Sequence, residues 1–385
     1  MNPDDTECVA GVSDDAHALA TDRDTRAAVV RQVGGPFILE QCRIDAPRAD
    51  EILIRMVATG MCHTDIVVRD QLIPTPLPVV LGHEGAGVVE AVGVDVRKVV
   101  PGDHVVLTFL SCGRCFSCQT RNPASCENFY ALNFAGHRED GSHGVHADVS
   151  DRFFGQSSFA TFALAHERNV VKVRSDVPLE LLGPLGCGIQ TGAGTVLNAL
   201  KVAAGARFVA FGAGAVGLSA VMAARIAGAT TIVAVDRVPA RLALARELGA
   251  THVIDARSVD AVAAIREITG GGADYTMDST GRVDVIRQAV DALRPGGECA
   301  IVGASAIGAE LRLDVNELMA QRKSIRGVVE GASCPDFFIP HLIELYVQGR
   351  FPFDKLVRFY EFDQINQAAA DSENGLAIKP VIRIR

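Results

Sequence analysis

The chain has no excess of positive charge. Over 385 residues, 37 lysines and arginines stand against 46 aspartates and glutamates, which gives a formal net charge of −9. Proteins that bind nucleic acid or an anionic membrane surface usually carry a basic field, so this balance argues against both classes. We therefore expect a protein whose partner is a small molecule.

The N-terminus also lacks the features of a secretory signal. It begins MNPDDTECVAGVSDD, which is acidic where a signal is basic, and no long apolar core precedes Arg23. The 17 uncharged residues from Phe208 to Ala224 approach the length of a membrane span. Three glycines near the start of this run favour a buried strand, a turn and a helix instead. We expect a cytoplasmic protein with an acidic N-terminal tail over residues 1–26.

The length of the chain and the pattern of its apolar segments indicate two domains. With 48% hydrophobic and 22% charged residues, a chain of this length can bury more than one core. Residues 27–188 carry short Val, Ile and Leu runs between Gly, Pro and Asp, which predicts a mostly β domain. Residues 189–330 alternate helical and continuously apolar segments, which predicts a doubly wound α/β domain with a parallel sheet. Residues 331–385 no longer show this alternation, and we expect them to return to the first domain.

A glycine-rich turn in the α/β domain is typical of dinucleotide binding. RFVAFGAGAVGLSAV gives a strand, a G-x-G-x-x-G turn and a helix, whose N-terminus offers unpaired N–H groups to phosphates. The next apolar strand ends in Asp236, whose carboxylate suits the ribose hydroxyls and favours NAD over NADP. Two nearby arginines soften that preference, because cations bind a 2′-phosphate. The cofactor residues expected here are Gly212, Gly214, Ala215, Val216, Gly217, Asp236, Arg237 and Arg241.

Four of the ten cysteines lie within one loop. Cys112, Cys115, Cys118 and Cys126 have the spacing of a closed tetrahedral zinc site, which has a structural role because no ligand position is left for substrate. A chance cluster of reduced cysteines or a redox centre is the alternative. A second set of zinc-type ligands, Cys62, His83 and Cys187, is dispersed along the chain, and spacing alone does not predict that these three residues meet.

The order of these motifs resembles the zinc-dependent medium-chain alcohol dehydrogenases. CHTD, GHEGAGVVEAVG, the four-cysteine loop, GCG-x-x-TG and GAGAVG carry the resemblance, which runs from about Arg26 to the C-terminus and is strongest to the aryl (benzyl) alcohol dehydrogenases. It implies a GroES-like catalytic domain formed by residues 27–188 and 331–385, with a Rossmann domain inserted between them. It also implies a homo-oligomer, either a dimer or a tetramer.

The resemblance also assigns roles to single residues. It implies a second, catalytic zinc held by Cys62, His83 and Cys187, with Asp65 orienting the histidine. Glu84 would lie near this zinc and enter its coordination during ligand exchange, although a structural salt bridge is an alternative role. The zinc would lower the pKa of a bound alcohol, and the resulting alkoxide would pass a hydride to NAD. Thr64 would take the alcohol proton, unless it only satisfies a backbone group, and the resemblance places His63, Thr191 and Lys379 at the cofactor.

One position departs from the family pattern. Many relatives carry a histidine five residues after the first zinc ligand, where it passes the proton to solvent, and this chain has Val67. Arg69 or water would have to replace that histidine. The departure leaves hydride transfer intact but puts the proton route in doubt.

The substrate is predicted only as a class. Ile73 and Phe109 fall where relatives line the alcohol pocket, and aromatics between Phe129 and Phe162 add to it, unless these rings only pack a long loop. An apolar pocket favours primary alcohols with an aromatic or long unsaturated group. One alternative is a thiol-dependent formaldehyde dehydrogenase. The other, from a different class, is a non-catalytic protein that binds NAD and zinc.

Overall fold

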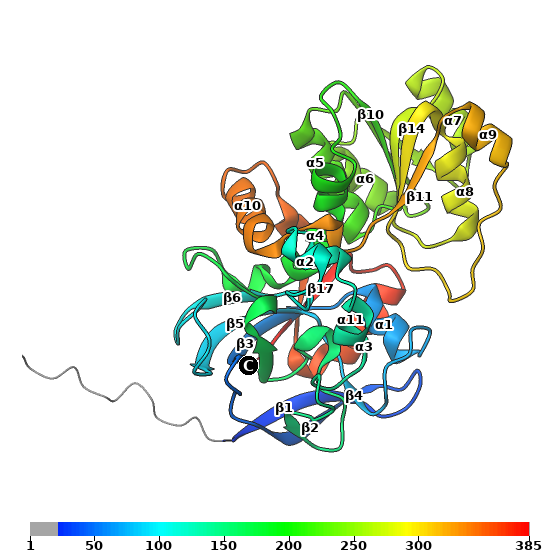
Figure 1. The fold of residues 1–385 in the computed structure, drawn as a ribbon. Helices are drawn as coiled ribbons and strands as arrows, with labels where there is room; N and C mark the ends of the chain where they lie inside the picture. The colour runs from blue at the N-terminus through cyan, green and yellow to red at the C-terminus, as the bar shows by residue number, and fades with distance from the viewer. Residues whose placement is uncertain (1–21, 385) are drawn as a thin grey trace, which may run out of the picture.

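The computed structural model describes residues 22–384, which fold into two lobes (Figure 1). Within this range, no helix is both long and apolar enough to cross a membrane. The tail predicted over residues 1–26 lies largely outside the described residues. Its last residues do not behave as a tail, because strand β1 begins at Arg23, where it pairs with Ile44 of β2.

The lower lobe in Figure 1 contains two largely antiparallel sheets. The larger one has the order β16 (Val357–Glu361), β17 (Lys379–Arg383), β3 (Glu51–Gly60), β5 (Glu84–Val92), β6 (His104–Leu107) and β9 (Val170–Lys172), with β8 (Phe162–His166) also paired to β3. The smaller one has the order β4 (Val79–Val80), β1 (Arg23–Val30), β2 (Phe37–Ile44) and β7 (Val145–His146). The helices around them are α1 (His63–Arg69), α2 (Phe116–Gln119), α3 (Phe129–Phe134), α10 (Pro335–Val347) and α11 (Ile365–Glu373).

The upper lobe is a parallel sheet covered by helices. Its order is β12 (His252–Asp255), β11 (Thr231–Asp236), β10 (Arg207–Phe211), β13 (Ala273–Asp278), β14 (Leu293–Ile301) and β15 (Ser324–Gly327). Its helices are α5 (Ala215–Ala227), α6 (Pro239–Leu248), α7 (Ala261–Thr269), α8 (Val283–Asp291) and α9 (Val315–Ala320). The central strands are buried along nearly their whole length, as a sheet covered on both faces requires. The predicted α/β fold, a mostly β part joined to a Rossmann-type sheet, is confirmed.

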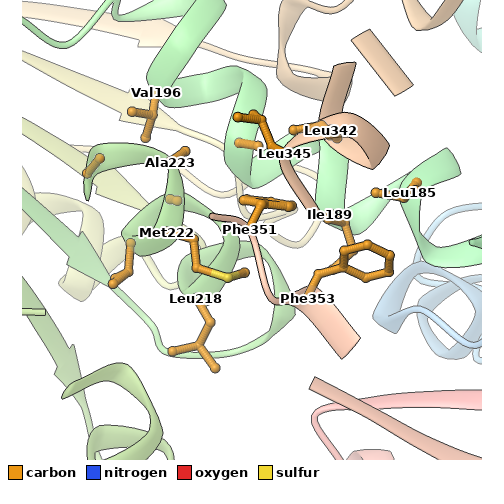
Figure 2. Packing of buried hydrophobic residues seen from close by; sticks show 14 of the residues in the cluster. Leu185, Ile189, Val196, Leu218, Met222, Ala223, Leu342, Leu345, Phe351 and Phe353 are labelled. Atoms are coloured by element: carbon orange, nitrogen blue, oxygen red, sulfur yellow. The ribbon is translucent and has the colours of Figure 1, made fainter. Parts of the chain in front are cut away.

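The largest hydrophobic core joins the two lobes. Figure 2 shows Phe351 and Phe353, which follow α10, packed with Leu218 and Met222 of α5 and with Ile189 of helix α4 (Gly188–Gly194). Helix α4 begins directly after Cys187. This core therefore fixes the element that carries one of the predicted zinc ligands.

A buried ion cluster anchors the segment that leads to β7. The Glu51 carboxylate is 6% exposed and accepts hydrogen bonds from Arg138 Nε at 2.8 Å and from Arg152 Nη2 at 2.6 Å. Burial opposes ionisation of Glu51, but the two guanidinium groups outweigh it and lower the pKa of this carboxyl. The cluster therefore favours the folded state when Glu51 is ionised.

We expect Glu51→Gln to lower the free energy of unfolding by about 3–5 kcal/mol at neutral pH, because it leaves buried Arg152 without an ion-pair partner and Arg138 with Asp45 alone. The folded pKa of Glu51 lies below the unfolded value of about 4.3, so its contribution is present above that pH and is lost as pH falls through the folded pKa. Denaturant titrations from pH 7 to pH 3 measure this difference. If the difference in free energy of unfolding between wild type and variant stayed constant over that pH range, ionised Glu51 would not be the source of the stabilisation.

Candidate active site

Four ligand-type side chains from distant parts of the chain converge at the junction of the lobes. Cys62 caps the N-terminus of α1, His83 and Glu84 lie at the start of β5, and Cys187 precedes α4. Their ligand atoms all lie within 4.8 Å of one another. The structure thus brings together the dispersed set that spacing alone did not predict.

Asp65 fixes both the histidine and the first cysteine. Its Oδ1 lies 2.9 Å from His83 Nδ1 and accepts the Gly82 N–H at 3.0 Å, while its Oδ2 accepts the Cys62 N–H at 2.8 Å. The His83 side chain is fully buried, and its Nε2 has no hydrogen-bond partner. A buried ring nitrogen is rarely left unpaired, and here it lies among thiol sulfurs, so the donor set fits a zinc ion.

The two cysteine thiols are electrostatically coupled. Cys187 donates to the sulfur of Cys62, which, together with the positive charge of Lys379, holds the pKa of Cys62 well below its ordinary value despite burial. The same contact raises the pKa of Cys187 well above its ordinary value. The lowered pKa of Cys62 favours its thiolate, the form in which cysteine binds a metal.

Glu84 is held by a lysine from the other end of the chain. Lys379 Nζ lies 2.8 and 2.9 Å from the two carboxylate oxygens of Glu84, and the Gly188 N–H donates to Oε1 at 3.2 Å. Both charged side chains are buried. Lys379 was expected at the cofactor, and the structure instead places its ammonium group on Glu84, beside the zinc-type ligands.

Glu330 is a residue of this site that the sequence reasoning missed. Its side chain lies 3.3 Å from Gln190 Nε2 and 3.5 Å from the hydroxyl of Thr191, the predicted cofactor residue. Burial raises the pKa of Glu330 to about 7, partly opposed by the positive potential of His83. The segment GVVEGASCP carries no metal or nucleotide motif, so a sequence signal for this residue was absent.

The first turn of α1 carries the other predicted residues near the zinc-type ligands. Thr64 Oγ1 lies 3.7 Å from Cys62 Sγ, and His63 is exposed to solvent. The side chain at position 67 is a buried valine, which has no titratable group and so cannot replace the histidine. The Arg69 guanidinium is bound by Asp70 and Glu373, which raises its pKa above the ordinary value. A guanidinium held in this way does not release a proton, which argues against Arg69 as the substitute for the histidine.

The four-cysteine loop closes on itself. The sulfur atoms of Cys112, Cys115, Cys118 and Cys126 all lie within 4.8 Å of one another. The backbone N–H of Cys112 donates to Cys126 Sγ and that of Cys115 to Cys112 Sγ, each at 3.3 Å. Burial raises the pKa of the Cys112 thiol, but the backbone N–H groups of Arg114 and Cys115 outweigh it and lower that pKa to about 6. Four sulfurs at this separation fit a tetrahedral zinc ion.

The glycine loop has the shape that a pyrophosphate requires. Gly212 has φ +93°, and a Cβ at Gly217 would lie 1.8 Å from the Gly212 carbonyl oxygen, so glycine is required at Gly217. Gly214 caps helix α5, and a Cβ there would meet no atom within 4 Å. Helix α5 begins with the predicted Ala215 and Val216. The N-terminus of α5 is therefore open to a phosphate group.

Asp236 lies at the carboxyl end of β11, next to this loop. Its Oδ2 accepts the Ala213 N–H at 2.6 Å, and its Oδ1 accepts the Arg237 N–H at 2.7 Å. The Arg237 side chain is exposed. Arg241 Nε is buried without a partner, and its guanidinium approaches Gly375 of the other lobe. Of the two predicted arginines, Arg237 thus directly follows the carboxylate expected to bind the ribose, whereas the Arg241 guanidinium lies against the other lobe.

Aromatic rings pack against His83. Phe154 stacks on the His83 ring, with centroids 4.5 Å apart, and adopts φ +54°, which is unusual for a bulky residue. Phe129 lies 6.3 Å from the Phe154 ring and 5.7 Å from the Phe109 ring. Ile73 packs against the same hydrophobic cluster. The two predicted pocket residues thus share one apolar region with His83.

Comparison with known proteins agrees with this architecture. Residues 48–175 match the alcohol dehydrogenase GroES-like domain, and residues 215–346 match the zinc-binding dehydrogenase domain. The geraniol dehydrogenase of Castellaniella defragrans is 49% identical over 362 residues, which cover 93% of this chain and 97% of that protein.

Two solved structures superpose closely. The benzyl alcohol dehydrogenase of Acinetobacter calcoaceticus has a TM-score of 0.93 at 55% identity, and an alcohol dehydrogenase zinc-binding domain protein from Burkholderia ambifaria has a TM-score of 0.93 at 58% identity. Each match covers 94% of this chain and 100% of the other. The fold, the converging ligands and these similarities agree along almost the whole chain, which belongs to the zinc-dependent medium-chain alcohol dehydrogenase family.

Proposed function

We propose that this enzyme oxidises primary aryl or allylic alcohols to aldehydes, reversibly, with NAD as hydride acceptor. The observation that carries the proposal is the orphaned His83 Nε2 between the sulfurs of Cys62 and Cys187. The aromatic rings beside it supply an apolar wall for an aryl or allylic group. Relatives named geraniol dehydrogenase and benzyl alcohol dehydrogenase support the same substrate class.

The residues have the following proposed roles. Cys62, His83 and Cys187 would hold a catalytic zinc, which would supply the Lewis acidity that favours loss of the alcohol proton. Asp65 keeps the His83 ring oriented, and the Thr64 hydroxyl accepts the alcohol proton while it passes its own proton on to water. Glu84, neutralised by Lys379, stands close enough to exchange with a zinc ligand.

The proposed cofactors are NAD and two zinc ions per chain. The Asp236 carboxylate beside the glycine loop favours NAD over NADP. The loop of Cys112, Cys115, Cys118 and Cys126 holds a second, structural zinc, for two per chain. We further propose a catalytic domain of residues 27–188 and 331–385, a nucleotide domain of residues 189–330, and a dimer or tetramer.

The test is NADH formation at 340 nm by zinc-loaded protein with benzyl alcohol, geraniol, ethanol, and formaldehyde with and without a thiol. Fast turnover of benzyl alcohol and geraniol is expected, with ethanol slow. NADP in place of NAD serves as the cofactor control. Activity with none of these substrates would favour the non-catalytic alternative.

A thiol-dependent formaldehyde dehydrogenase is the second candidate. A cavity of about 460 Å³ beside Phe109 is bordered by Arg97, Lys98, Arg121 and Arg168. A thiol adduct that carries carboxylates would need such cations. Lys98 already forms an ion pair with Asp336, which reduces the positive charge available to bind the carboxylates of an adduct. Turnover of formaldehyde only in the presence of a thiol would support this candidate over the first.

Val67 makes the pH dependence informative. We expect Val67→His to shift the pH profile of turnover toward lower pH, because a histidine of ordinary pKa near 6.5 adds a proton acceptor that the buried valine lacks. Stopped-flow rates of NADH formation from pH 5.5 to pH 9.5 measure the effect. Val67→Leu is the matched control, and an unchanged profile for Val67→His would refute the role of this position in proton release.

A further inference from the structure

Glu330 lies at the edge of the parallel sheet where ligands bind. It begins a short 3₁₀ turn, residues Glu330–Ala332, three residues after the end of β15. Gly212 follows β10 and Asp236 ends β11 at the same carboxyl edge. The sheet order runs β11, β10, β13, β14, β15, so a dinucleotide held at Asp236 and at the glycine loop has its other end on the β15 side.

The neighbours of Glu330 join the two halves of the site. Its carboxylate contacts Gln190 and Thr191 on α4, the helix that begins after Cys187. Helix α4 also packs closely on α5, since a Cβ at Gly192 would lie 2.0 Å from the Val216 carbonyl oxygen. Glu330 thus lies beside the helix that connects the zinc-type ligands to the phosphate-binding loop.

No lysine or arginine forms an ion pair with Glu330 within residues 22–384. It is 6% exposed, and its two side-chain donors there, Gln190 and Thr191, are neutral. The nearby Lys379 ammonium is bound by Glu84. A zinc ion with two thiolate ligands is formally neutral and supplies no net counter-charge. A buried carboxylate without a cation is costly, so a ligand that brings a positive charge would be favoured here.

The backbone of Glu330 is held in an unfavourable conformation. Glu330 has φ +48° and Ala332 has φ +47°, both in the left-handed region. The Ser333 hydroxyl donates to the Glu330 carbonyl at 2.6 Å, and the turn packs so closely on α4 that a Cβ at Gly331 would lie 2.4 Å from the Gln190 carbonyl. Strain of this kind persists where the surrounding structure fixes a functional side chain.

We propose that Glu330 is the counter-ion of the oxidised nicotinamide ring. The ring of NAD⁺ carries a positive charge that is lost when it accepts a hydride, so a fixed carboxylate stabilises the bound oxidised cofactor and not the reduced one. Glu330 therefore favours binding of NAD⁺ and release of NADH, the direction of alcohol oxidation. This inference rests on the proposed function, because it requires NAD at this site.

The test compares three ligands on the zinc-loaded enzyme. In Glu330→Gln, which keeps size and an acceptor oxygen but removes the charge, the Kd of NAD⁺ is expected to rise about tenfold. The Kd values of NADH and of ADP-ribose, which has no pyridinium, should stay unchanged. NADH fluorescence titration gives the first value, and competition against NADH gives the other two. Glu330→Asp, which keeps the charge, should behave as wild type, and Asp371→Asn removes another buried carboxylate as a matched control.

Two results would overturn the inference. One is an equal change in all three Kd values, which indicates a structural role, and the other is an unchanged ratio of NAD⁺ to NADH affinity. Glu330→Gly is a second neutral variant that relieves the positive φ, so it keeps the test open if Glu330→Gln folds poorly. Wild-type protein that binds neither dinucleotide would instead refute the proposed function.

Discussion

Asp65→Ala is expected to lower the zinc affinity of the site formed by Cys62, His83 and Cys187 by about 10–100-fold, with a parallel loss of turnover. The carboxylate accepts hydrogen bonds from two backbone N–H groups and from the His83 ring, so its removal frees the ring to rotate. It also leaves three buried donors unpaired, at about 1–3 kcal/mol each. Zinc competition with a chromophoric chelator measures the affinity, and denaturant titration measures the stability.

Asp65→Asn separates the two effects. The amide keeps one acceptor oxygen, so it should recover part of the stability, while its NH₂ group cannot serve as a second acceptor. Zinc affinity is therefore expected between those of wild type and Asp65→Ala. Unchanged zinc affinity in Asp65→Ala would show that His83 does not depend on this carboxylate for its orientation.

Cys115→Ser is expected to reduce the zinc content from two ions per chain to one. The four sulfurs of the loop lie within 4.8 Å of one another, and a serine hydroxyl is a poor zinc ligand at neutral pH. Binding energy at a structural zinc site contributes directly to folding, so residues 112–126 should lose their ordered conformation. Elemental analysis gives the stoichiometry, and amide hydrogen exchange across the loop reports the local unfolding.

Cys334→Ser is the matched control, because Cys334 borders the cavity next to the loop but lies outside the cysteine cluster. It should retain both zinc ions and the exchange protection of the loop. A Cys115→Ser protein that still binds two zinc ions would contradict the assignment of the loop. Loss of all zinc would instead show that the two sites depend on each other.

The features predicted from the sequence are those whose defining residues lie close together in the chain. The glycine turn can be recognised in the sequence because its strand, turn and helix are contiguous. The carbonyl oxygen that excludes a Cβ at Gly217 belongs to Gly212, only five residues earlier. The four-cysteine loop is likewise one short segment. Both patterns can be read without knowing how distant parts of the chain meet.

The remaining residues depend on tertiary contacts that no short pattern records. Cys62, His83 and Cys187 come from three separate elements, and only the resemblance to a family joined them. Glu330 reaches α4 through a strained turn that follows β15, 140 positions later in the chain than its contact on α4. Lys379 and Glu84 are 295 positions apart in the chain, so no short pattern reveals their ion pair, and the resemblance placed Lys379 at the cofactor.

The central place of β17 has a consequence for biosynthesis. This strand lies between β16 and β3, and Lys379 reaches the Met61 carbonyl, 318 positions earlier in the chain. A ribosome adding 5–20 residues per second leaves that edge of β3 unpaired for roughly half a minute after it has made it. During this interval the nascent chain exposes an apolar strand edge that another chain can pair with, so chaperones have a defined segment to protect.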